Sequence, residues 1–178
     1  EHAPLTDIEV AALIDETMED AMRKKFAATQ DVDYTYLVPD VVRCRVNAFV
    51  ALRGPAAVFR LIPAKTPTLE ELGIPEIVRE TLLGLDRGLV LVTGPAGSGK
   101  TSTLAAMVEL LNRERQSHIL TIEDPVEFIH PSVAALVNHR ELGTSTMSFE
   151  RALKSALRED PDIIVIGEMR DLETIQLA

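Results

Sequence analysis

The chain has 178 residues, a length that suits one ordinary domain or two small ones, and 46% of them are hydrophobic, enough for a sizeable core. Its 28 acidic and 18 basic side chains give a net charge of -10, which argues against a surface built mainly to bind nucleic acid. No apolar run approaches the roughly 18 residues of a membrane helix. No signal-peptide pattern is present either, so we expect a cytoplasmic protein. The single Cys44 excludes an internal disulfide and is expected in a core, and the four histidines lack metal-ligand spacing.

The first 62 residues predict a small α+β unit. Thr6 and Glu9 form a capping-box pattern, and apolar residues then recur at helical spacing as far as Phe26, which predicts an amphipathic helix. Between 33 and 62, runs rich in Tyr, Val and Phe alternate with turn residues, which predicts three antiparallel strands. We therefore expect residues 1–62 to form one unit.

The next stretch predicts a boundary between two domains. Residues 63–67 (PAKTP) break the pattern, and their two prolines lack backbone donors, so we expect an interdomain linker there. Residues 68–178 then form the second domain. A capping-box pattern at Thr68 and Glu71 predicts a short helix at its start, and Pro75 is expected to begin another.

The most informative stretch of the second domain is the glycine-rich segment GPAGSGKT, which fits the phosphate-binding pattern of Gly, any four residues, Gly, Lys and Thr. In this pattern main-chain N–H groups surround a β-phosphate, Lys100 reaches the β and γ oxygens, and the Thr101 hydroxyl ligates Mg²⁺. The apolar run 88–93 before it predicts a buried parallel strand, and the residues after it repeat at helical spacing. The expected ATP-binding residues are Gly94, Pro95, Ala96, Gly97, Ser98, Gly99, Lys100, Thr101 and Ser102.

Further along the chain, strands and helices alternate, which predicts a parallel sheet flanked by helices and hence an α/β fold. The expected strands are 118–122, 135–138 and 163–166, and a helix is expected at 148–158. Residues 171–178 look like the first two turns of another helix and stop in the middle of the pattern. We therefore expect the sequence to be a fragment of a longer chain.

Acidic residues follow two of these strands, at the sheet edge where open α/β sheets bind ligands. Glu127 lies in the segment EDPVE after the first strand, and Glu168 follows the last one. Both are candidates to orient or deprotonate the water that attacks a γ-phosphate, and Glu168 is alternatively a ligand of Mg²⁺ through water. Asp124 fits either chemistry or a turn, and Asp171 is expected to cap the next helix.

Four arginines of the first unit, Arg43, Arg45, Arg53 and Arg60, form the other charged group of interest. A solvated strand face is the ordinary explanation, because alternation places Arg43 and Arg45 on one face. The sharper interpretation is that some of them close over the triphosphate as an arginine finger does. Both interpretations stay open at this point.

Several segments together resemble the PilT family of type IV pilus retraction ATPases, within the secretion-ATPase superfamily. They are the glycine loop, RVNAF at 45–49, GPAAVFRLIP at 54–63, TIEDPVEF at 121–128 and ALREDPDIIVIGEMRDLETI at 156–175. Met169 and Glu159 stand where the related extension and type II secretion ATPases usually have Ile and Gln, which favours retraction over extension.

The resemblance implies a partial PAS-like N-terminal domain followed by the N-terminal part of a RecA-like P-loop ATPase domain. It implies a homo-hexameric ring that hydrolyses Mg·ATP, has no direct nucleic-acid contact, and meets the inner membrane only through a platform protein of the pilus machine. It also implies that Lys100 and Thr101 are the Walker A pair, that Glu127 activates water and that Glu168 is the Walker B carboxylate. A His box and a C-terminal retraction motif are expected beyond residue 178, so we expect this chain alone to hold a nucleotide without turning it over.

Three other functions remain open on the sequence alone. A pilus extension or type II secretion ATPase of the same superfamily shares the glycine loop. A RecA-like nucleic-acid translocase shares it too, although the negative charge disfavours that function. The third is a nucleotide-gated scaffold without hydrolysis, and the presence of Glu127 and Glu168 speaks against it.

Overall fold

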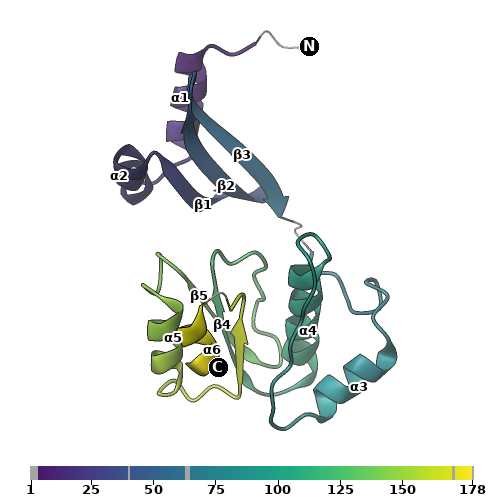
Figure 1. Cartoon of the computed structure of the whole chain (residues 1–178). Helices are drawn as coiled ribbons and strands as arrows, with labels where there is room; N and C mark the ends of the chain where they lie inside the picture. The colour runs from purple at the N-terminus through teal and green to yellow at the C-terminus, as the bar shows by residue number, and fades with distance from the viewer. Residues whose placement is uncertain (1–3, 40, 63–64, 170, 178) are drawn as a thin grey trace. The chain divides into compact units, whose positions relative to one another are not determined.

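The computed structural model describes residues 4–39, 41–62, 65–169 and 171–177. They form two compact units, Glu1–Ala64 and Lys65–Ala178, and each has its own three-stranded sheet (Figure 1). Residues 63 and 64 of the expected linker lie outside the described residues. In the described part of the chain, no helix is both long and apolar enough to cross a membrane.

The first unit is an antiparallel sheet covered by two helices, and it confirms the three predicted strands. Its elements are α1 (Asp7–Glu16), α2 (Asp20–Thr29), β1 (Asp31–Val38), β2 (Val42–Ala51) and β3 (Gly54–Ile62), with the strands in the order β1-β2-β3. Alternate residues of β2, namely Cys44, Val46 and Ala48, point into the core and are almost fully buried. The expected core position of Cys44 is therefore confirmed.

The single N-terminal helix predicted as far as Phe26 is wrong, because the chain forms two helices there. The capping box of Thr6 and Glu9 is present at the start of α1. The break comes at Thr17, whose hydroxyl lies 2.7 Å from the Ile14 carbonyl, to which it donates, and 2.5 Å from the Tyr34 hydroxyl. The backbone of Glu19 is extended, so the apolar pattern continues across the break in a new helix.

The second unit is a parallel sheet flanked by helices, which confirms the predicted α/β fold. Its elements are α3 (Glu76–Gly84), α4 (Lys100–Glu114), β4 (His118–Glu123), β5 (Leu136–Glu141), α5 (Phe149–Ala156), β6 (Ile163–Ile166) and α6 (Leu172–Leu177). The strand order is β5-β4-β6, with both pairs parallel. Ile119, Leu120 and Ile122 of the central strand are at most 1% exposed, so the core of this unit is built around β4.

The short helix predicted after Thr68 is a turn. The capping-box hydrogen bonds form, since the Thr68 N–H donates to Glu71 Oε2 at 2.8 Å and the Glu71 N–H donates to Thr68 Oγ1 at 3.1 Å. The turn closes at once because Gly73 adopts a φ of +69°, a conformation that ends helices.

The parallel strand predicted at 88–93 is also wrong for this structure. The segment has no regular secondary structure and pairs with no strand of the described chain, whose parallel sheet ends at β6. Leu89 and Leu91 are 66% and 57% exposed. An apolar run becomes a strand only when a neighbour accepts and donates its backbone hydrogen bonds, and the residues described here supply none beside it.

Candidate active site

The glycine loop 94–99 leads directly into α4, which begins at Lys100. Gly94, Gly97 and Gly99 have φ values of +156°, +76° and +93°, which other residues rarely adopt. A Cβ on Gly94 would also lie 2.6 Å from Ser98 Oγ. The local sequence therefore selects glycine by backbone geometry, as the phosphate-binding pattern requires.

The start of α4 is suited to an anion. The first four N–H groups of a helix have no intrahelical acceptor, and the helix dipole adds positive charge at that end. Lys100 is half-buried, and its ammonium donates to the Pro95 carbonyl of the same loop at 2.8 Å. Because phosphate oxygens are charged acceptors, they would form a stronger bond with this ammonium than the carbonyl does. Thr101 follows in the first turn, where its hydroxyl suits Mg²⁺.

The two candidate carboxylates follow neighbouring parallel strands. Glu127 comes four residues after the end of β4, and Glu168 comes two residues after the end of β6, and both are half-buried. Gly167 donates its N–H to the Ile122 carbonyl at 2.9 Å, which brings the Glu168 segment against β4. A Cβ on Gly167 would lie 3.2 Å from Glu123 Cγ, so this close approach favours glycine.

The other two acidic candidates, Asp171 and Asp124, lie in different environments. Asp171 caps α6: its carboxylate accepts the Thr174 N–H at 2.7 Å and the Thr174 hydroxyl at 2.8 Å. These bonds lower the pKa of Asp171, the main-chain bond first. The expected capping role is confirmed. Asp124 is exposed at the first position after β4.

The arginines of the first unit separate into two places. Arg45 pairs with Arg60 across β2 and β3, and Arg43 lies two residues away on the same face of the sheet. Arg53 lies instead in the turn between the two strands. The Nε atom of Arg45 is 3.8 Å from the Asp33 carboxylate. Three of the four predicted arginines therefore share one face, and Arg53 does not join them.

Sequence reasoning missed a buried polar group behind the acidic segment. The His130 ring, 4% exposed, has its Nδ1 3.0 Å from Glu109 Oε2, and it stacks on the His139 ring with centroids 5.8 Å apart. Burial raises the pKa of Glu109, but hydrogen bonds from His130 and Arg113 outweigh it and leave that pKa below its ordinary value. The group joins α4, β5 and the segment after β4, so it depends on tertiary packing that the spacing of the histidines does not reveal.

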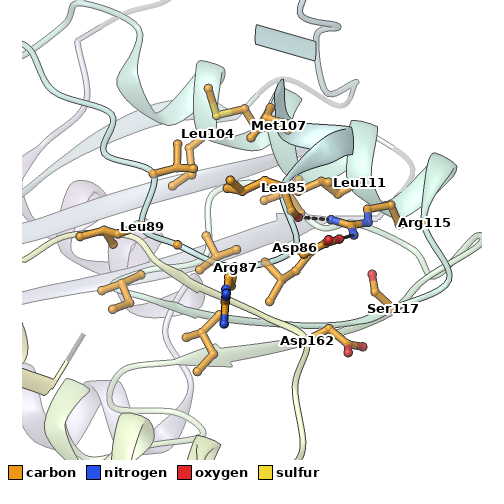
Figure 2. Close-up of a pocket in the computed structure, with 18 of the residues that line it drawn as sticks. Leu85, Asp86, Arg87, Leu89, Leu104, Met107, Leu111, Arg115, Ser117 and Asp162 are labelled. Carbon is orange, nitrogen blue, oxygen red and sulfur yellow. Dashed lines mark hydrogen bonds and ion pairs between the residues drawn. The ribbon is translucent and has the colours of Figure 1, made fainter. Parts of the chain in front are cut away.

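One pocket of this unit lies between the segment after α3, helix α4 and strand β6 (Figure 2). Apolar side chains from all three parts line it, among them Leu89, Met107 and Ile164. Figure 2 shows Arg115 directed at the Leu85 carbonyl, to which it donates at 2.8 Å, and at Asp86, 3.6 Å away. Its lining residues come from outside the glycine loop, so this pocket is distinct from the candidate phosphate site.

The family model that matches this chain is described as "Type II/IV secretion system protein" and covers residues 10–178. The chain is 56% identical over 175 residues to the type IV pilus retractation ATPase PilT of Pseudomonas aeruginosa, across 98% of this chain and 51% of that protein. It is 54% identical over 170 residues to a twitching motility protein of Neisseria gonorrhoeae, across 96% of this chain and 45% of that protein.

A solved structure of the pilus retraction motor PilT with bound ADP resembles this one with a TM-score of 0.89 at 43% identity, over 93% of this chain and 48% of that chain. The chain thus spans about half the length of the relatives it matches. These matches cover both units and support a RecA-like ATPase fold preceded by a small α+β unit. Because the family model covers almost the whole chain, the protein belongs to the type II/IV secretion system protein family.

Proposed function

We propose that the whole protein to which this chain belongs is a Mg·ATP-hydrolysing motor ATPase that powers type IV pilus retraction. The observation that carries the proposal is the glycine loop, whose positive-φ glycines present the N-terminus of α4 to an anion. The identity to PilT over both units supports retraction as the work done.

Each candidate residue has one role in this proposal. The loop residues from Gly94 to Ser102 hold the phosphates, and Lys100 contacts the β and γ oxygens. Mg²⁺, held by Thr101 and through water by Glu168, would neutralise charge on the phosphates. Glu127 orients or deprotonates the attacking water. Support for the two carboxylates comes from their place beyond the ends of parallel strands, the ligand-binding edge of such sheets.

The proposal includes an assembly and a place in the cell. The protein acts as a homo-hexameric ring in the cytoplasm, at the inner-membrane face, where a platform protein of the pilus machine receives its motion. The similarity to the pilus retraction motor PilT supports a role in pilus retraction, and the assembly and location are proposed with that role. Nucleic acid is not a direct partner, and the net charge of -10 supports that view.

The test is Glu127→Gln in the whole protein. Gln keeps the size of the side chain but removes its basicity, so ATP binding should persist while turnover falls by on the order of 10² or more. Glu80→Gln, an exposed position on α3, is the matched control and should leave turnover unchanged. In a Pseudomonas aeruginosa strain lacking PilT, the unaltered protein should restore twitching and Glu127→Gln should not. Turnover that requires DNA would instead support the nucleic-acid translocase.

A further inference from the structure

Hydrogen bonds from main-chain N–H groups hold the acidic segment after β4 in place on both sides of Glu127. The N–H of Val126, the residue before Glu127, donates to Glu141 Oε2 at 2.9 Å. The N–H of His130, three residues after Glu127, donates to His139 Nε2 at 3.1 Å. Val126 and His130 are both buried, so water cannot easily replace the two side-chain acceptors as hydrogen-bond partners of these N–H groups.

Both acceptors come from the same face of β5. His139 and Glu141 are two residues apart, so their side chains point to the same side of the strand. The register sets them directly beside Thr121 and Glu123, at the end of β4 where the acidic segment begins. The pairing of β4 with β5 therefore places two acceptors, His139 and Glu141, within hydrogen-bond distance of the main-chain N–H groups of the segment.

The hydrogen bonds also define the state of the His139 ring. A main-chain N–H only donates, so Nε2 is the acceptor and the proton of the neutral ring lies on Nδ1. Nδ1 lies 2.8 Å from Thr121 Oγ1, to which it then donates, and the Glu123 carboxylate lies 3.9 Å from the same nitrogen. The ring is therefore held from both sides, with its acceptor directed at the acidic segment.

Helix α4 holds the residues that follow the acidic segment. Glu109 Oε2 lies 3.0 Å from His130 Nδ1, and the fully buried Asn112 donates to the Pro131 carbonyl at 2.8 Å and accepts the Val133 N–H at 3.1 Å. Helix α4 begins at Lys100, directly after the glycine loop. These bonds therefore connect the residues after the acidic segment to the same helix that follows the loop.

We propose that His139 and Glu141 are positioning residues, which hold the main chain on both sides of Glu127 and so direct its carboxylate toward the attacking water. This inference rests on the proposed role of Glu127 in hydrolysis. It adds a specific requirement: a hydrogen-bond acceptor at each of the two β5 positions.

The test compares variants of the whole protein that keep or remove each acceptor. His139→Leu and Glu141→Met remove an acceptor at similar volume, and each should lower kcat by on the order of 10- to 100-fold with little change in KM for ATP. His139→Gln and Glu141→Gln keep an acceptor oxygen and should retain most of kcat. Asn138→Ala, on the opposite face of β5, is the matched control and should leave kcat unchanged.

Two further measurements separate positioning from general stability. Amide hydrogen exchange should speed up at Val126 in Glu141→Met and at His130 in His139→Leu, with β4 still protected. In a Glu127→Gln background, His139→Leu should cause no additional loss of kcat, because both changes act on one carboxylate.

Several outcomes would overturn the proposal. They are an equal loss of kcat in Leu and Gln variants of His139, an unchanged kcat in both acceptor-removing variants, or full additivity with Glu127→Gln. If Glu127→Gln alone keeps normal turnover, the proposed role of Glu127 fails instead. The exchange data at Val126 and His130 then still decide whether β5 holds the segment.

Discussion

In the glycine loop, the need for glycine follows from the local backbone geometry. Gly94 is required twice, by its φ of +156° and by the 2.6 Å that would separate a Cβ from Ser98 Oγ. Gly99 turns the chain into α4 from a left-handed conformation. With the loop so shaped, the Lys100 ammonium remains beside it and donates to the Pro95 carbonyl.

Lys100→Ala should therefore weaken ATP binding without unfolding the protein. The variant removes a charge-assisted contact of about 1.5–3 kcal/mol, which corresponds to about a 10- to 150-fold rise in Kd. Isothermal calorimetry with Mg·ATP measures the change, and Lys154→Ala on α5, an exposed lysine paired with Glu150, is the control. Equal affinity of Lys100→Ala and the unaltered protein would contradict the assignment of the phosphate site.

Among the elements, the sequence predicted those that depend on local chemistry. The capping box of Thr6 and Glu9 forms as expected, and the apolar run 163–166 is β6. The helix break at Thr17 was missed because the apolar period continues through it, and the Thr17 hydroxyl there bonds both the nearby Ile14 carbonyl and the distant Tyr34 hydroxyl. Periodicity reports which face is buried and carries no information about such contacts.

The candidate site likewise combines features set by local sequence with features set by distant contacts. The glycine loop is contiguous in sequence, so its positive-φ glycines and its place before α4 could be predicted from eight residues. The support behind Glu127 comes from His139 and Glu141, which reach it only through the register of β4 with β5. Pairing between strands 13 residues or more apart is a tertiary property that local patterns do not encode.

Segment 88–93 and the outer edge of β6 both lack a neighbouring strand among the described residues. Leu89, Leu91 and Ile164 are 66%, 57% and 37% exposed, and the pocket of Figure 2 separates the segment from β6. An apolar segment and a strand edge that line one pocket suit a further strand between them that hydrogen-bonds to both. The relatives are about twice as long as this chain, so their additional length is a natural source of that strand.

We therefore expect the amides of 89–92 to exchange differently in the two forms of the protein. In the 178-residue chain alone they should exchange nearly as fast as in an unstructured peptide, because none of the described residues forms a partner strand for their N–H groups. In the whole protein they should be at least about 100-fold slower. Amides 119–122 of β4, paired on both sides, serve as the control and should be protected in both forms. Rapid exchange of 89–92 in the whole protein would rule out the inserted strand.

For the whole molecule, the proposed function requires that ATP hydrolysis be converted into motion. The chain folds as two compact units, Glu1–Ala64 and Lys65–Ala178, each with its own core. Arg43, Arg45 and Arg60 share one face of the first sheet, and the glycine loop belongs to the second unit. A few linker residues suffice to absorb a hinge rotation between such units. We propose that ATP draws these arginines toward the γ-phosphate, whereas ADP lacks the group that would attract them.

This hinge predicts a nucleotide-dependent distance between the units in the whole protein. A ligand shifts a conformational equilibrium only through its different affinity for the two states, and the γ-phosphate supplies that difference to the arginines. Probes on Leu52→Cys in the β2–β3 turn and Glu80→Cys on α3 would report the distance, because both sites are exposed and Cys44 is buried. A non-hydrolysable ATP analogue should shift the distance distribution relative to ADP, and Arg45→Gln with Arg60→Gln should remove the shift while ATP still binds through Lys100. Identical distributions with the analogue and with ADP would leave the arginines as an ordinary solvated strand face.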